Sequence, residues 1–183
     1  AYGSFPLYLL RFIQYVYDWL PWSDINDLRI VGRSISALAD VAAVAVVYFL
    51  GRSAYGRREG LLAAAMASVA VIHIQLSHFY AVDTLLSLFT VLSLFFMYLF
   101  ARDGRPKYSV LAGVFIGLGL ATKISQAPIL FAYAMAHILF LVNAVGPDKS
   151  HISTSERVRN SLQGIGGGVA AMLVVLLAAQ PYM

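Results

Sequence analysis

The sequence has no cysteine, and only 12% of its 183 residues are charged. The absence of cysteine excludes disulfide frameworks, thiolate nucleophiles and cysteine-based zinc sites. A soluble domain usually carries about 25% charged residues, so this low charge, with 60% hydrophobic residues, all but excludes a soluble globular domain. Disordered, collagenous and disulfide-rich secreted chains are excluded as well. A membrane protein is the class that remains.

Motifs of common enzyme classes are also absent. The sequence contains no Walker loop, GxGxxG, HExxH, GxSxG or DxD motif, and its histidines show no i, i+3 or i, i+4 pair typical of a metal site. We therefore expect neither a metal ion nor an organic cofactor. The net charge of +4 is better explained by basic loops on the cytoplasmic side of a membrane than by a nucleic-acid partner.

Long apolar runs dominate the chain, whose mean hydropathy is +0.76. A helix needs about 20 residues to cross a hydrocarbon core of ~30 Å, and the lack of period-two alternation argues against a membrane barrel. Six segments are predicted to span the membrane as helices: 28–50, 60–77, 83–101, 109–125, 127–145 and 161–181. The segment 109–125 is the weakest of them, because its apolar part is short.

The segment "FPLYLLRFIQYVYDWLPW" precedes the first span and predicts an interfacial helix over residues 6–20. Its many Tyr and Trp side chains favour the membrane–water interface, and Pro6 suits the first turn of a helix. Arg11 and Asp18 make the segment a poor span. The predicted fold is therefore an all-α, polytopic membrane helix bundle, with an interfacial segment on the outer face (1–22) and six spans (23–183).

The basic residues orient this bundle. The predicted loops 51–59, 102–107 and 146–160 hold nine of the 13 Lys and Arg residues, and they lie on one side if the six spans alternate. The positive-inside rule makes that side cytoplasmic, in a multi-pass protein of the bacterial plasma (inner) membrane. The chain has no initiator Met and ends directly after an apolar run, so we expect it to be an internal fragment of a longer protein.

Small residues predict where spans pack closely. GxxxG motifs occur at Gly113–Gly117 and at Gly164–Gly168. Such spacing lets the backbones of two membrane helices approach each other.

Polar residues inside the spans need a reason, because a membrane interior makes them costly. For Asp40 we favour a buried polar contact or a protonated acid over a proton relay, since burial readily raises the pKa of a carboxyl group. His73 and His137 either form hydrogen bonds between helices or ligate the metal of a haem or pigment.

The outer face is predicted to gather three cations: Arg29 and Arg33 at the start of the first span, and Lys123 at the end of 109–125. Convergent cations suit a phosphate or pyrophosphate group. The alternative is simple contact with lipid headgroups, which we prefer for Arg29 but not for Lys123, because Lys123 lies between two apolar spans. Asp83, in the outer turn "SHFYAVD", either caps its helix or contacts substrate.

The order of these features resembles membrane glycosyltransferases of the GT-C class. The chain is most similar to the branch with protein O-mannosyltransferases and the aminoarabinose transferases that modify lipid A. Four stretches carry the resemblance: "YGSFPLYLL", "GRSISALADVAAVAVVYFLGRSAYGRREGLLAA", "LSHFYAVDTLLSLF" and "GLGLATKISQAPIL". They are similar to the Pro-Pro-Leu segment of the family, its Arg-led span with a basic inner loop, its second outer turn, and its Gly-rich span ending in Thr-Lys.

The resemblance implies an inverting enzyme that takes a sugar from a polyprenyl-phosphate donor, within membrane lipid, at the outer face. It places the catalytic Asp of the family upstream of Ala1, so we name no catalytic base in this chain. Lys123 and Arg33 are expected to contact the donor phosphate, while His78 and Asp83 shape the acceptor side. The candidate substrate-binding residues are Lys123, Arg33, His78, Tyr80, Asp83 and Ser4.

A second function from another class stays open. The chain could instead be a non-catalytic accessory subunit of a larger photosynthetic or respiratory membrane complex, in which His73 or His137 contacts a pigment or haem. A transporter is disfavoured, because no inverted repeat with paired broken helices is visible.

Overall fold

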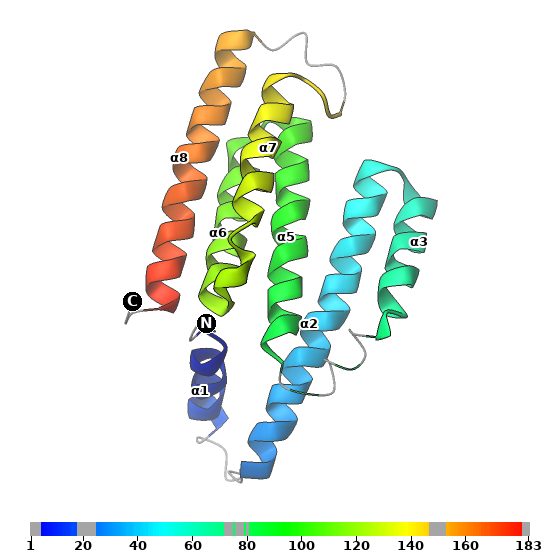
Figure 1. Ribbon diagram of the computed structural model, residues 1–183, viewed down its shortest axis with the longest axis vertical. Coiled ribbons are helices and arrows are strands. Elements are labelled where there is room, and N and C mark those ends of the chain that lie inside the picture. Colours follow the sequence, from blue (N-terminus) through cyan, green and yellow to red (C-terminus); the bar gives the residue numbers. More distant parts are fainter. Residues whose placement is uncertain are drawn as a thin grey trace. The chain divides into compact units, whose positions relative to one another are not determined.

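The computed structural model of the chain describes residues 5–17, 25–71, 75, 79, 81–146 and 153–180. The regular elements of these residues are helices, which confirms the predicted all-α fold class (Figure 1). They are α1 (Phe5–Tyr17), α2 (Ile25–Ala54), α3 (Arg57–Ser68), α5 (Val82–Asp103), α6 (Pro106–Thr122), the 3₁₀ helix η1 (Ile124–Gln126), α7 (Ile129–Leu141) and α8 (Thr154–Ala179).

Among the described residues, four stretches are long and apolar enough to cross a membrane, and they correspond to four of the six predicted spans. They are Ile30–Ala54, Val82–Asp103, Ile124–Leu141 and Thr154–Ala179. The predicted span 109–125 corresponds to α6, an apolar helix of 17 residues, which is about 25 Å long at 1.5 Å per residue. The predicted span 60–77 begins in α3, and its residues 72–74 and 76–77 lie outside the described part.

The chain divides into two compact units, each with contacts of its own. The first unit contains the residues up to Leu88 together with 121–124, and the second contains Phe89–Leu120 and the residues from Ser125 onward. Helices α1, α2 and α3 belong to the first unit, as does the first turn of α5. Most of α5 and α6, with α7 and α8, belong to the second.

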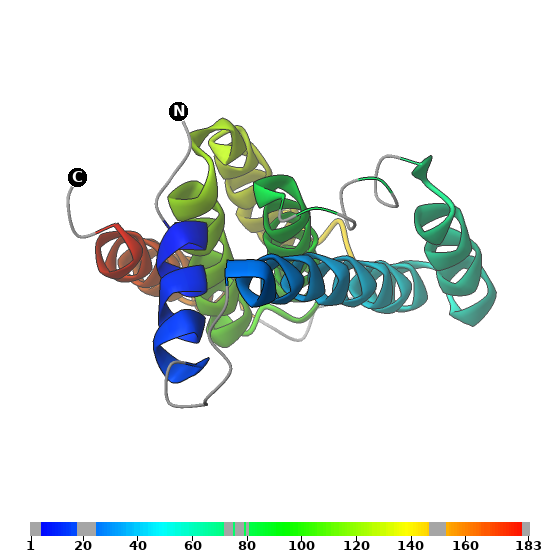
Figure 2. The ribbon, with the colours of Figure 1, turned by 90° about the horizontal axis from the view of Figure 1, so that it is seen from below.

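In the first unit, α2 and α3 form a helical hairpin. Gly56 makes the turn with φ of 130°, a conformation that side-chain-bearing residues rarely adopt. The two helices approach each other at Gly51 and Gly60, since a Cβ atom on Gly60 would lie 2.7 Å from the Tyr48 carbonyl oxygen. Figure 2 shows α1 lying crosswise to α2. Helix α1 covers most of the predicted interfacial segment 6–20, whose last three residues lie outside the described part.

The basic residues expected in the third loop lie partly on a helix instead. Arg157 and Arg159 were predicted in the loop 146–160, but α8 already begins at Thr154. The reason is a helix cap, because the Ser153 hydroxyl accepts a hydrogen bond from the Glu156 backbone N–H at 3.2 Å. Such a cap satisfies a backbone donor of the first turn, and the Ser-x-x-Glu sequence is its recognisable signature.

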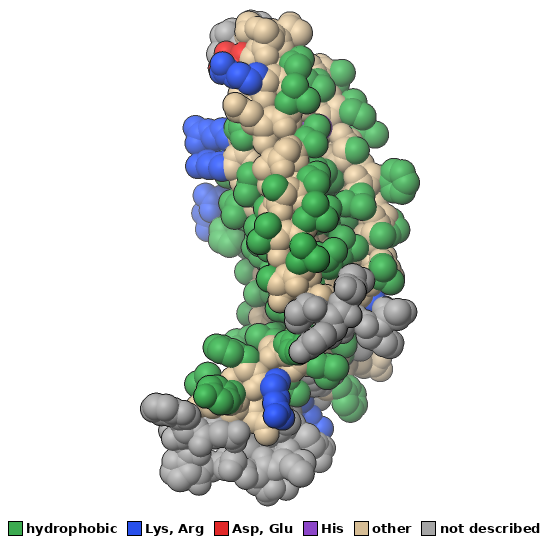
Figure 3. All heavy atoms as spheres, turned by 90° about the vertical axis from the view of Figure 1, so that its left-hand side faces the viewer, with side chains coloured by type: hydrophobic (Ala, Val, Ile, Leu, Met, Phe, Trp, Pro, Cys, Tyr) green, Lys and Arg blue, Asp and Glu red, His purple; other side chains and the backbone are tan. Residues whose placement is uncertain are grey.

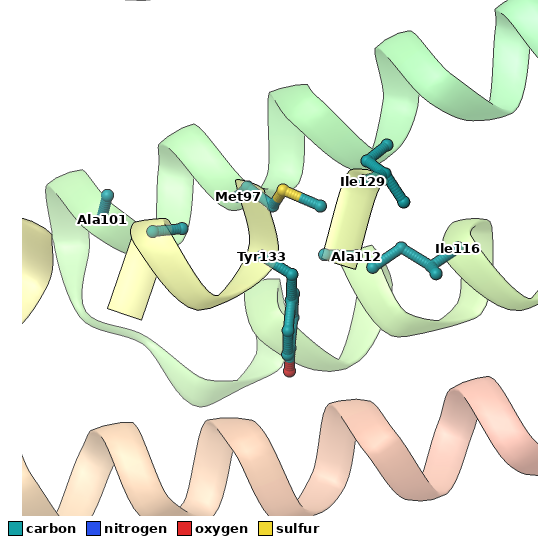
Figure 4. Packing of buried hydrophobic residues seen from close by; sticks show 7 residues of the cluster. Met97, Ala101, Ala112, Ile116, Ile129 and Tyr133 are labelled. Carbon is teal, nitrogen blue, oxygen red and sulfur yellow. The ribbon is translucent and has the colours of Figure 1, made fainter. Parts of the chain in front are cut away.

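The core of the second unit lies between α5, α6 and α7 (Figure 4). The turn from α5 into α6 is tight: Gly104 has φ of 67°, and its N–H donates to the Phe100 carbonyl at 2.7 Å. A Cβ atom on Gly104 would lie 2.1 Å from the Phe140 ring, so only glycine fits this turn. The buried core residues are Met97, Ala101, Ala112, Ile116, Ile129, Tyr133 and Ala136.

Helices α6 and α8 pack with their backbones in contact, as the GxxxG motifs predict. A Cβ atom on Gly113 would lie 2.0 Å from the Gly168 carbonyl oxygen, and one on Gly117 would lie 2.7 Å from the Met172 carbonyl oxygen. The opposite face of α8 exposes large apolar side chains such as Leu173 and Leu177. Figure 3 shows hydrophobic side chains along this helix and charged ones beside its start, the distribution expected of a helix in contact with lipid.

Candidate functional site

The start of α5 is fastened to α2 inside the first unit. The Ala81 backbone N–H donates a hydrogen bond of 3.2 Å to the Ser36 hydroxyl of α2, and the Thr84 hydroxyl donates to the Ala81 carbonyl at 2.7 Å. The side chains of Ser36 and Thr84 are fully buried. Buried polar groups hold their geometry when their hydrogen bonds are satisfied, so this junction fixes where the first turn of α5 begins.

An ion pair lies at this junction. The Lys123 ammonium donates to the Asp83 carboxylate at 2.7 Å, and the two side chains are 27% and 40% exposed. Asp83 lies inside the first turn of α5, which starts at Val82, and not at the cap position that was one of its predicted roles. Lys123 directly follows α6. Each charge therefore lies at the helix end whose dipole favours its sign.

The pair does more to position the two side chains than to stabilise the fold. Partly exposed ion pairs typically contribute about 0–1 kcal/mol to the free energy of unfolding. A lysine ammonium held at a helix end and still reachable by solvent, however, is a ready contact for an anionic ligand. The structure thus brings together two of the predicted site residues, Lys123 and Asp83.

Arg33 lies on α2, three residues before Ser36, and its side chain is exposed. Three residues of helix are about 4.5 Å of rise, so Arg33 lies roughly one turn from the contact with Ala81 that fastens α5. Ser4, His78 and Tyr80, the other candidate substrate-binding residues, lie outside the described residues, as does the side chain of Arg29.

A second polar cluster lies in the second unit, and it was predicted only in part. The Ser109 hydroxyl of α6 lies 2.6 Å from the Tyr133 hydroxyl and 3.0 Å from His137 Nε2, and it donates to the Gly164 carbonyl at 2.9 Å. On the other side of the ring, His137 Nδ1 lies 3.0 Å from the Ser161 hydroxyl of α8. The cluster links α6, α7 and α8, and all of these side chains are buried.

The contacts of His137 decide between its two predicted roles. His137 Nε2 lies 3.0 Å from the Ser109 hydroxyl and Nδ1 lies 3.0 Å from the Ser161 hydroxyl, and in either neutral tautomer one ring nitrogen donates and the other accepts. A metal needs a free ring nitrogen, and both nitrogens are occupied here. The predicted hydrogen bond between helices is confirmed for His137, whereas His73 lies outside the described residues.

The side chains of the described residues offer no cluster suited to a metal. Among these residues, no group of three or more His, Asp or Glu side chains could hold a metal ion. Asp40 is half-buried in α2. Lys123 and Arg33 are side chains that can stabilise a negative charge.

Several apolar helices define the class of the protein, a multi-pass membrane protein. A sequence profile described as dolichyl-phosphate-mannose-protein mannosyltransferase matches residues 24–179. The chain belongs to this family, and it is a membrane glycosyltransferase of the GT-C class. The comparisons with curated proteins and with solved structures gave no match.

Proposed function

We propose that the protein transfers a sugar from a polyprenyl-phosphate donor to an acceptor hydroxyl at the extracytoplasmic face of the plasma (inner) membrane. The family description names a dolichyl-phosphate sugar, which is a sugar on a polyprenyl phosphate. The apolar helices supply a surface for the prenyl chain. Membrane lipid thus both surrounds the protein and carries the substrate.

The observation that carries this proposal is the placement of Lys123. Its ammonium lies 2.7 Å from Asp83 at the start of α5, and the same start is tied to the segment of α2 that bears Arg33. Two cations near the start of one helix can hold two oxygens of one phosphate. We assign Lys123 and Arg33 to the donor phosphate. We assign His78 to the acceptor side together with Asp83, which lies next to that phosphate because it contacts Lys123. Tyr80 and Ser4 complete the proposed substrate contacts.

The proposed transfer forms one bond to the anomeric carbon of the sugar and breaks another. The acceptor oxygen forms a bond to the anomeric carbon with inversion, the bond from that carbon to the phosphate oxygen breaks, and the lipid phosphate leaves with the electron pair. The acceptor proton goes to a carboxylate base, a role that we assign to no residue of this chain. Cations at the leaving phosphate stabilise the charge that develops in the transition state.

The orientation of the chain follows from its basic residues. Arg52 lies in the last turn of α2, Arg57 is the first residue of α3, and Arg102 lies in the last turn of α5. If the helices between them cross the membrane, these ends share one side, which the positive-inside rule makes cytoplasmic. Lys123, at the far end of α6, then belongs to the extracytoplasmic side.

Lys123→Ala in the membrane-embedded full-length enzyme tests this proposal. Loss of one positioned charge typically costs about 10²–10³ in rate, so we expect a drop of about 100-fold in kcat/KM with a polyprenyl-phosphate sugar. Lys107→Ala is the matched control, since Lys107 is an exposed lysine at the opposite end of α6. Its transfer rate should equal that of the wild type.

Equal activity of the Lys123→Ala enzyme and the wild type would refute the assignment of Lys123. A chain purified with a bound tetrapyrrole, seen as a Soret band, would instead support the accessory-subunit function. The contacts of His137 with two serines give no support to such a ligand at that position.

A further inference from the structure

The ion pair of Asp83 with Lys123, at the start of α5, can break without leaving either charge in an unfavourable place. Asp83 lies in the first turn of α5 and Lys123 follows the last turn of α6, so each charge keeps a favourable helix end when the other leaves. Both side chains are partly exposed, and the lysine ammonium sits on a flexible stem. Lys123 can therefore turn from Asp83 toward a phosphate oxygen while the C-terminal end of α6 still favours its positive charge.

From this geometry we infer that Asp83, held beside the phosphate site by its contact with Lys123, repels the lipid phosphate and so favours release of the product over retention of the donor. The inference rests on the proposed function. Asp83 is a positioning residue in this role, because it touches Lys123 and not the reacting atoms.

Asp83 repels the product more strongly than the donor, because the two ligands differ in charge. The donor is a phosphodiester with one negative charge, whereas the leaving prenyl phosphate is a monoester with close to two negative charges above neutral pH. Coulomb repulsion from one carboxylate scales with the charge it meets. Asp83 therefore weakens the binding of the product about twice as much, in free energy, as the binding of the donor.

Calorimetric titration of the detergent-solubilised protein tests the inference with two probes. Geranylgeranyl phosphate and its methyl ester share one lipid and differ in charge, and at pH 8 the monoester is doubly charged. Neutralising a partly exposed carboxylate next to the phosphate is expected to lower Kd about threefold for the methyl ester and about tenfold for the monoester. The variant is Asp83→Asn, and Asp83→Ser takes its place if the asparagine variant does not fold.

Two controls separate this effect from a loss of structure. Asp83→Glu keeps the charge and should restore the wild-type ratio of the two Kd values. Asp103→Asn removes the other paired aspartate of α5, which contacts Arg102 at 2.6 Å, and it should change neither Kd.

In turnover, Asp83→Asn should lower both KM for the donor and kcat, because product release slows. A merely structural role would raise KM.

The outcomes distinguish the two proposals. If the wild-type protein binds neither prenyl phosphate, the proposed function fails and the inference fails with it. If the wild type binds both, and Asp83→Asn weakens binding or changes both Kd values by the same factor, only the inference is overturned. A larger gain for the monoester than for the methyl ester supports it.

Discussion

Ser109 is the centre of the buried polar cluster, since its hydroxyl contacts Tyr133, His137 and the Gly164 carbonyl. Ser109→Ala removes all three of these contacts, whereas Ser161→Ala removes only the contact at His137 Nδ1. Hydrogen bonds between membrane helices contribute about 0.6 kcal/mol on average and up to about 1.7. We expect Ser109→Ala to lower the free energy of unfolding by about 1–2 kcal/mol and Ser161→Ala by about 0.5–1 kcal/mol.

Unfolding of the purified variants in mixed micelles measures this difference. Ser125→Ala, which truncates an exposed serine of η1, is the control and should match the wild type. A Ser161→Ala variant that is less stable than Ser109→Ala would show that Ser109 is not the centre of the cluster.

At the residue scale, the sequence predicts which side chains need partners but not which partners they find. His137 is recognisable from the sequence because a histidine inside a span demands a hydrogen bond. Its partners Ser109 and Ser161 are 28 and 24 residues away, and no spacing rule links residues on three different helices. The ion pair of Lys123 with Asp83 joins residues 40 positions apart, and it was predicted only as a shared face.

At the scale of the elements, the contact between α6 and α8 depends on a missing side chain. A Cβ atom on Gly168 would lie 2.0 Å from the Tyr133 hydroxyl and 2.8 Å from the Ser109 carbonyl oxygen. Gly168→Ala should therefore push the helices apart and lower the free energy of unfolding by about 1–3 kcal/mol. Unfolding in mixed micelles is again the measurement.

Gly166 provides a matched control on the same helix. A Cβ atom there meets nothing within 4 Å, and alanine favours a helix over glycine by about 0.5–1 kcal/mol. Gly166→Ala should thus be neutral or slightly stabilising. If both alanine variants lost the same stability, helix propensity and not packing would explain the loss.

Helix ends were predicted less well than helix centres. The GxxxG motifs indicated the contact of α6 with α8, because small residues at that spacing have few other uses in a span. The start of α8 was missed, although Ser153 and Glu156 form a capping pattern, because the basic residues that follow were interpreted as a loop. Local hydrogen bonds decide such boundaries, and hydropathy does not detect them.

For the whole molecule, the absence of cysteine makes sidedness directly measurable. Arg105 and Ser125 are exposed and flank α6. We expect a membrane-impermeant maleimide to label Ser125→Cys in intact cells, and Arg105→Cys only after permeabilisation. The cysteine-free parent chain is the control and should remain unlabelled.

Two other results would be informative. Labelling of both variants from one side would mean that α6 does not cross the membrane, and the reverse pattern would invert the proposed orientation.

The sequence was sufficient to predict a helical membrane protein, because the composition of the chain allows few other classes. Low charge and long apolar runs exclude a water-soluble fold. In a membrane the backbone polar groups must bond to one another, and helices satisfy them within each segment. Three spans were predicted to within four residues of the bounds that the structure gives them, and the fourth, 161–181, begins seven residues earlier, at Thr154. The ion pair beside the proposed phosphate site joins residues 40 positions apart in the sequence, so only the structure could place it.

The central claim is that Lys123 and Arg33 hold the same phosphate, and a double-mutant cycle tests it most directly. The quantity measured is Kd for geranylgeranyl phosphate in the wild type, Lys123→Ala, Arg33→Ala and the double variant. We expect each single change to weaken binding about tenfold and the double change by only about 20- to 30-fold, because residues that share one ligand are not additive. A loss of about 100-fold in the double variant, the product of two independent effects, or an unchanged Kd in Arg33→Ala would contradict the account.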